Sequence, residues 1–148
     1  MAGVLSLVFV GWEIRQNTTA IRGSTYQAVA DANMEWLMFL LENPETAHLV
    51  QRWASGDTTM SEPEVVRARL GILTFWRTIE NAHYQYLQGN LPEEAVRRWV
   101  RPEVFNNPVL RDWWQGSRHQ FTPVFQAYVD SLTESAADQP DSGRGFVP

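Results

Sequence analysis

Residues 14–42 read IRQNTTAIRGSTYQAVADANMEWLMFLLE, and this stretch decides the fold because it predicts one long helix. No proline occurs between about residue 3 and residue 42, and Asn43-Pro44 ends the run, since the residue before a proline is pushed out of the α region. Small and apolar residues recur at steps of three or four, which keeps them on one helical face. The face that we expect to be buried carries Ile14, Thr18, Ile21, Thr25, Ala28, Ala32, Trp36 and Phe39.

The end of this helix, residues 36–41, reads WLMFLL and is apolar on every side. Such a segment must be covered from several directions, either by other helices of the chain or by a second subunit. The middle of the predicted stripe carries small side chains, at Thr18, Thr25, Ala28 and Ala32, which lets a partner helix approach closely. The sequence therefore raises the prospect of a homodimer formed through the first helix.

Proline, glycine and capping residues divide the rest of the chain into shorter helices. Ser61 and Glu64 form the pattern of a capping box, and Gly89-Asn90 ends the helix that follows. We expect helices at about 44–55 and 61–87, and three more that begin near 91, 107 and 122. Their predicted buried residues are Ile72, Phe75, Trp76, Ile79, His83, Tyr86, Leu87, Val96, Trp99, Val100, Leu110, Trp113, Trp114, Phe125, Tyr128, Val129 and Leu132.

These patterns predict an all-α fold, a small helical bundle of about five to six helices with a long N-terminal helix. The apolar segment 1–12 precedes the bundle at 13–134. Residues 135–148, SAADQPDSGRGFVP, are small and polar and predict a disordered tail.

The composition of the 148 residues excludes several classes of function. There is no cysteine, which excludes disulfides, thiolate metal sites and cysteine nucleophiles. All twelve basic residues are arginine, so a phosphate-binding loop with its lysine and lysine-dependent Schiff-base chemistry are excluded as well. The net charge of −5 argues against nucleic acid as a partner.

Residues 1–12, MAGVLSLVFVGW, carry no charge. A membrane-spanning helix needs about 20 apolar residues, so this run is too short by itself. It is either the first turns of a long core helix or the inner end of a membrane helix that begins upstream. Trp12 suits a membrane interface, and Arg15 and Arg22 after the run favour a cytoplasmic main body.

Part of this region carries a resemblance to a known family. Residues 14–18 (IRQNT), 20–22 (AIR) and 25–27 (TYQ) match the opening of a family of uncharacterised bacterial proteins, in which an apolar helix runs into an IRQNT-x-AIR-x-x-TYQ segment. Later stretches, among them 75–77 and 113–114, look similar too, and the likeness covers roughly residues 5–132. The resemblance implies attachment to a membrane and adds no chemistry.

The strongest metal signal is a repeated Glu-x-x-His, in which both side chains face the same way on a helix. It occurs as Glu45 with His48 and again as Glu80 with His83. Two such pairs, with one glutamate from each of two further helices, build a di-iron carboxylate site. Glu45 lies directly after Pro44, however, where an acid is expected simply because it complements the helix dipole.

His83 lies in the middle of a predicted apolar stripe. We expect a buried neutral imidazole that is hydrogen-bonded to Glu80 or to a polar residue of the first helix such as Thr25. The alternative is a small-molecule pocket lined by His83, Glu80 and Trp76. A separate set of arginines is either a solvated face or a contact for anionic lipid, namely Arg97, Arg98, Arg101, Arg111 and Arg118.

No catalytic set emerges from these residues, and no cofactor is expected. The leading hypothesis is a non-enzymatic, membrane-associated helical scaffold or interaction protein on the cytoplasmic face of the bacterial inner membrane, or else in the cytoplasm. The alternatives are a di-metal carboxylate enzyme and a helical bundle that binds a small molecule.

Overall fold

A computed structural model describes residues 2–100 and 102–137, where helices are joined by turns and no strand occurs, with side chains described for 8–100 and 104–134. The fold is a small all-α bundle, as predicted. Six α-helices and two 3-10 helices follow one another as α1 (Ala2–Glu42), α2 (Pro44–Ala54), α3 (Glu62–Leu87), α4 (Glu93–Arg97), η1 (Pro102–Asn106), α5 (Pro108–Ser117), η2 (Arg118–Gln120) and α6 (Pro123–Ala137).

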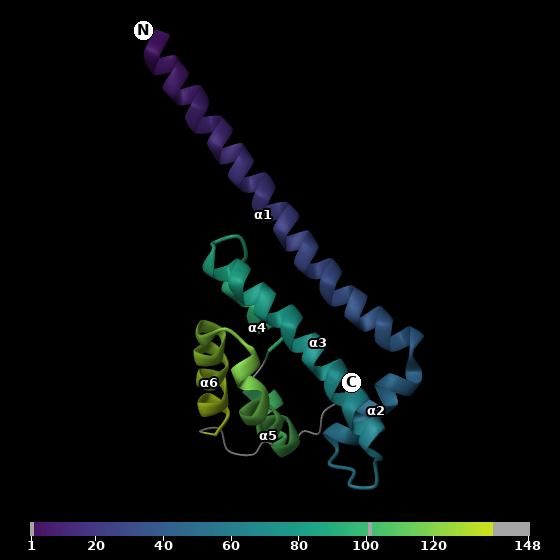
Figure 1. Ribbon diagram of the computed structural model, residues 1–148. Coiled ribbons are helices and arrows are strands. Elements are labelled where there is room, and N and C mark those ends of the chain that lie inside the picture. The colour runs from purple at the N-terminus through teal and green to yellow at the C-terminus, as the bar shows by residue number, and fades with distance from the viewer. Residues whose placement is uncertain (1, 101, 138–148) are drawn as a thin grey trace.

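The long helix α1 is confirmed, and it projects far beyond the rest of the molecule (Figure 1). Only its second half packs against α2 and α3. The helix stops at Asn43, whose side-chain amide donates to the carbonyl of Phe39 at 2.8 Å. The chain then turns at Pro44 into α2, which lies against the first half of α3.

The buried face of α1 differs from the predicted stripe. Ile14 and Ile21 are 61% and 47% exposed, Thr18, Ala28 and Phe39 are exposed, and Thr25, Ala32 and Trp36 are half-buried. The face turned to the bundle centres on Val29, which is buried and was not in the predicted stripe. Trp36, which was predicted, donates its indole N–H to the carbonyl of Gly71. The prediction is wrong for the first half of the helix, because that half has no neighbour in the described chain to bury the stripe.

The apolar end of α1 is only partly covered. Trp36 packs on Phe75 of α3 with ring centroids 4.7 Å apart, and Leu40 is half-buried. Leu37, Met38, Phe39 and Leu41 are 42–74% exposed, so the expectation that this segment is covered on several sides is not met within one chain.

The other helix boundaries follow the sequence signals closely. The capping box at the start of α3 is confirmed, since the Glu64 carboxylate accepts from the backbone N–H of Ser61 at 2.7 Å. Gly89, after the end of α3, has a φ of +72°, a conformation that a side chain would strain. The prediction that Leu87 of α3 is buried is wrong, because its side chain is 51% exposed.

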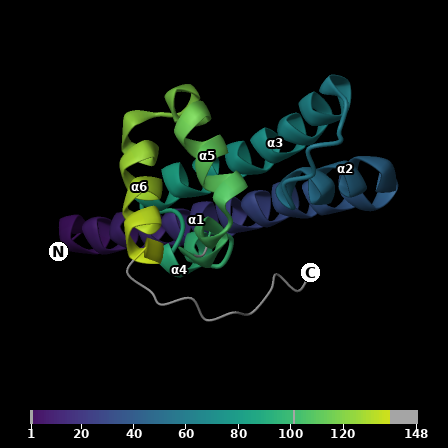
Figure 2. The same cartoon turned by 90° about the horizontal axis from the view of Figure 1, so that it is seen from below.

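Helices α5 and α6 lie on the side of α3 away from α1 in Figure 1, and Figure 2 shows the two side by side. Aromatic side chains from α3, η1, α5 and α6 form the core. Trp76 lies at its centre, with Phe105, Trp113, Trp114 and Phe125 at ring-centroid distances of 5.4–6.3 Å. Helix α6 continues to Ala137, so the tail predicted at 135–148 begins too early. The remainder of that predicted tail, 138–148, lies outside the described residues.

Candidate binding groove between α1 and α4

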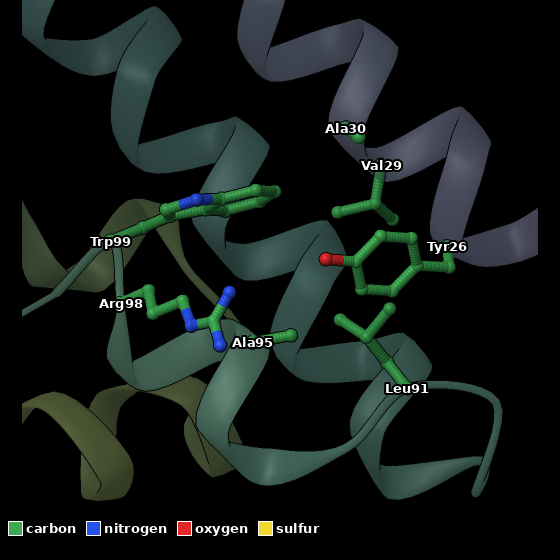
Figure 3. Close-up of a pocket in the computed structure, with 7 residues that line it drawn as sticks. All are labelled: Tyr26, Val29, Ala30, Leu91, Ala95, Arg98 and Trp99. Carbon is green, nitrogen blue, oxygen red and sulfur yellow. The ribbon is translucent and has the colours of Figure 1, made fainter.

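A small hollow lies where α1 crosses α4 (Figure 3). Its volume is about 70 Å³, and its walls come from Val29 and Ala30 of α1, from Leu91 in the loop before α4 and from Ala95 within α4. Leu91 and Ala95 are 4% and 8% exposed, so the floor is firmly packed. The hollow can take a small chemical group that has an apolar side.

Three polar groups surround this apolar floor. The hydroxyl of Tyr26 points from α1 across the hollow toward Trp99, and the guanidinium of Arg98 lies beside the same opening (Figure 3). None of the three side chains makes a hydrogen bond or ion pair with the described residues. The guanidinium of Arg98 can only donate, so the hollow has hydrogen-bond donors beside it that lack an acceptor.

A wider groove of about 550 Å³ adjoins the hollow, and the two share Tyr26 and Leu91. It runs between the Gly89–Pro92 loop and the middle of α1, where Gly23 leaves space and Arg22 stands at the edge. Ligand pockets in proteins commonly measure about 300–1,000 Å³, so the groove is large enough for a small molecule.

Local structure holds the loop side of this groove in place. Gly89 supplies the left-handed turn after α3, and the side-chain amide of Asn90 donates to that of Gln85 at 3.0 Å. Pro92 then begins α4 in an extended conformation. The groove therefore lies on a turn that is fixed by its own backbone and side-chain contacts.

The predicted pocket residues lie elsewhere. His83 is buried at 4% exposure, but its ring stacks on Tyr128 of α6 at a centroid distance of 4.3 Å and forms no hydrogen bond with the described residues. Glu80 accepts from Arg77 and from the backbone N–H of Thr122, both at 2.8 Å. His83, Glu80 and Trp76 line neither the hollow nor the wider groove.

Burial shifts the pKa of both His83 and Tyr128. It lowers the pKa of His83, and the nearby Glu80 carboxylate opposes that shift. Burial also raises the pKa of Tyr128, whose hydroxyl has no hydrogen-bond partner among the described residues. Burial thus favours the neutral form of the imidazole, and stacking on Tyr128 stands in place of the predicted hydrogen bond to Glu80 or Thr25.

The four predicted metal ligands do not converge. Glu45 is exposed and lies 3.4 Å from Arg67, His48 is exposed, and Glu80 and His83 face α6 and η2 with the contacts given above. Among the side chains described at 8–100 and 104–134, no three His, Asp or Glu are close enough together to hold a metal ion.

The membrane-interface candidates all lie on the exposed surface of α1. Trp12 is 56% exposed, with its ring centroid 6.3 Å from that of Phe9, and Arg15 and Arg22 are exposed. Within the described chain, no helix is both long and apolar enough to cross a membrane.

A comparison with protein families accounts for nearly the whole chain. A model described as a family of unknown function, DUF6082, matches residues 1–140. The chain belongs to the DUF6082 family. No curated protein and no solved structure matches this DUF6082 chain.

The remaining arginines of this DUF6082 member divide into paired and unpaired ones. Arg97 pairs with Glu93 at 2.8 Å, and Arg118 pairs with Asp130, which also accepts from the indole of Trp114. Arg98 and Arg111 have no partner among the described residues, and Arg101 lies outside them. The predicted basic set is therefore not one continuous surface.

Sequence reasoning missed the groove itself. Tyr26 contributes to the family resemblance, and Trp99 was expected to face inward, but no spacing in the sequence links residue 26 to residues 91–99. Their meeting depends on how α1 crosses the bundle. The one available signal was Gly89-Asn90, which predicts a turn but not what faces it.

Proposed function

We propose that this protein is a non-enzymatic, membrane-associated interaction protein, held at the cytoplasmic face of the bacterial membrane by the projecting end of α1. One observation carries the proposal. The first half of α1 projects from the bundle (Figure 1), and its large apolar side chains are 48–66% exposed, namely Val8, Phe9, Val10 and Trp12. Exposed apolar groups in such numbers are typical of a surface that contacts another apolar phase or partner.

The order of residues along α1 supports a membrane as that phase. The apolar turns come first, Trp12 follows with the amphipathic indole that favours the interface, and Arg15 and Arg22 come next. Arginine close to an anionic leaflet adds about 1 kcal/mol of attraction each. The bundle then lies on the aqueous side.

Flotation with lipid vesicles tests the attachment. The full chain is mixed with vesicles of phosphatidylcholine and phosphatidylglycerol, and we expect it to float with them. The double variant Phe9→Glu, Val10→Glu should stay at the bottom of the gradient. A matched control, Val66→Glu with Leu70→Glu, changes apolar residues of similar exposure on α3 and should float as the unchanged chain does. Equal flotation of both double variants, or none for the unchanged chain, would refute the attachment.

The interaction part of the proposal rests on the second half of α1. Met34, Leu37, Met38 and Leu41 occupy positions i, i+3, i+4 and i+7 on one helical face and are 42–74% exposed. A second copy in parallel orientation fits this apolar line, because both projecting ends then point to one membrane.

Sedimentation over a range of protein concentrations tests this pairing. We expect the unchanged chain to form a reversible dimer and Leu37→Glu with Leu41→Glu to remain a monomer. Because the chain has no cysteine, Leu37→Cys should also cross-link to itself under oxidation, whereas Glu35→Cys, on another face of the helix, should not. A chain that stays monomeric at all concentrations would end this part of the proposal.

A further inference from the structure

We infer that the groove between α1 and α4 binds an anionic amphiphile, a molecule with a carboxylate or phosphate head and an apolar chain. The head would lie in the hollow beside Arg98, Tyr26 and Trp99, and the chain along the wider groove past Leu91 and Gly23. This inference does not depend on membrane attachment, because the groove lies on the bundle and is open to solvent.

The charge of the lining residues favours an anion. The chain as a whole carries 17 acidic residues against 12 arginines. Yet the described residues that line the hollow and the wider groove include Arg22 and Arg98 and no carboxylate. A local excess of positive charge in an acidic protein therefore coincides with its groove.

The arginines at the groove are also unused by the fold. Five other arginines form ion pairs within the described chain, Arg52 with Asp57 at 2.7 Å among them. Arg22 and Arg98 form none with the described residues. A guanidinium that is free of protein partners keeps its donors for a bound carboxylate or phosphate.

The shape of the lining supplies the apolar half of the ligand. The buried Leu91 and Ala95 form the floor, with Val29 of α1 beside them and the ring of Tyr26 between Val29 and Leu91 (Figure 3). A simple inorganic anion would leave these groups in contact with water. An alkyl chain covers them, and burying each methylene contributes about 0.8 kcal/mol.

Calorimetric titration of the full chain with three eight-carbon probes tests the inference. Octanoate and octyl phosphate should bind and 1-octanol should bind at least tenfold more weakly, because it lacks the charge that meets Arg98. Acetate and inorganic phosphate should also bind at least tenfold more weakly, since they lack the chain. Octanoate binding more tightly than octyl phosphate would indicate a fatty acid, and the reverse order a phospholipid-like head.

Two arginine variants locate the site. Arg98→Gln should weaken octanoate binding about tenfold or more, the usual cost of losing a charge-assisted hydrogen bond. Arg111→Gln is the matched control, because Arg111 is equally free of partners but does not line either hollow, and it should bind as the unchanged chain does. Both side chains are exposed, so the fold should persist, which circular dichroism verifies.

Three results would overturn the inference. Equal affinity for octanoate and octanol would leave only an apolar groove, and equal affinity for octanoate and acetate would leave only an anion site. Unchanged binding in Arg98→Gln would place the ligand elsewhere. Tyr26→Phe gives an independent check, because loss of its hydroxyl should weaken binding of the head without changing the apolar wall.

Discussion

The projecting half of α1, residues 8–24, and the aromatic core of the bundle are both rich in large apolar side chains, yet their surroundings are opposite. Trp12 in the first region is 56% exposed, and Trp114 in the second is fully buried. Every described side chain between residues 8 and 24 is exposed. In the core, Trp76 alone contacts four other aromatic rings from η1, α5 and α6.

This difference shows that a helix and its apolar content do not determine burial. The core residues lie on short helices that turn at prolines and bring their rings together around α3. The first half of α1 is a single straight element, so nothing in the described chain folds back on it. Its apolar surface remains available for contacts outside one chain.

Truncating one tryptophan in each region should give the largest difference in the free energy of unfolding between the two regions. Trp114→Ala should lower the free energy of unfolding by about 3–5 kcal/mol, because it removes a buried ring and leaves a cavity. Trp12→Ala should change it by no more than about 0.5 kcal/mol, since the ring is 56% exposed and lies outside the core. Urea titration measures both, and equal losses would contradict the division into two regions.

The sequence predicts the helices of this fold well because their boundaries are local. Asn43-Pro44, the Ser61–Glu64 capping box, Gly89 and Asn107 each act within one turn of chain. Asn107 illustrates this, since its side-chain oxygen accepts from the backbone N–H of Val109 at 2.9 Å. The aromatic stripes of α3, α5 and α6 are predictable for the same reason, because each helix buries its single aromatic face.

The face of α1 and the groove could not be predicted in this way. Residues 14–39 contain small and apolar side chains on more than one face, so periodicity allowed a stripe through Ile14 and Ile21 that has no partner. Val29 is buried only because α3 and α4 meet it there. The groove likewise joins residues about 70 positions apart, and its unpaired Arg98 is known only once every potential partner has been placed.

A second pair of substitutions compares polar contacts in the two regions. Asp130 of α6 accepts from the indole N–H of Trp114 at 3.0 Å and pairs with Arg118. Asp130→Ala should cost about 1–3 kcal/mol, because it leaves a buried donor without its acceptor. Asp31→Ala on α1 breaks only an exposed hydrogen bond from Gln27 and should cost about 0.5 kcal/mol or less. A larger loss from Asp31→Ala would reverse the ranking of the two regions.

The dependence of stability on pH sharpens the contrast further, because all three histidines lie in the bundle. Burial lowers the pKa of His83 below its ordinary value of 6.5, so the unfolded chain binds a proton more readily than the folded one. Stability should therefore be complete above about pH 6.5 and fall as the pH drops below that value. The Asp57 carboxyl, with its pKa lowered to about 2, loses its contribution only below its ordinary 3.8 and does not interfere.

Urea titrations at pH 7.5 and 5.5 measure the effect of His83. The loss of stability between the two pH values should be smaller in His83→Phe, which keeps an aromatic ring against Tyr128 but cannot take up a proton. His48→Gln is the control, because His48 is exposed, and its loss should equal that of the unchanged chain. The same loss in all three proteins would mean that burial of His83 does not govern the response to acid.

The smallest expected effect comes from a substitution that tests whether the projecting half of α1 and the bundle unfold in one transition. Gly11 lies in the projecting half, and a methyl group added there meets nothing within 4 Å. Gly11→Ala should stabilise the local helix by about 0.5–1 kcal/mol, because glycine loses more backbone freedom than alanine on folding. Since residues 8–24 contribute no buried contact, this gain should appear as slower amide hydrogen exchange around residue 11, with the urea midpoint of the bundle unchanged.

Gly89→Ala, at a φ of +72°, should by contrast lower that midpoint by an amount corresponding to about 1–2 kcal/mol. If Gly11→Ala raised the midpoint by its full local gain, the projecting half would have to fold as one unit with the bundle, and its lack of packing would not make it independent.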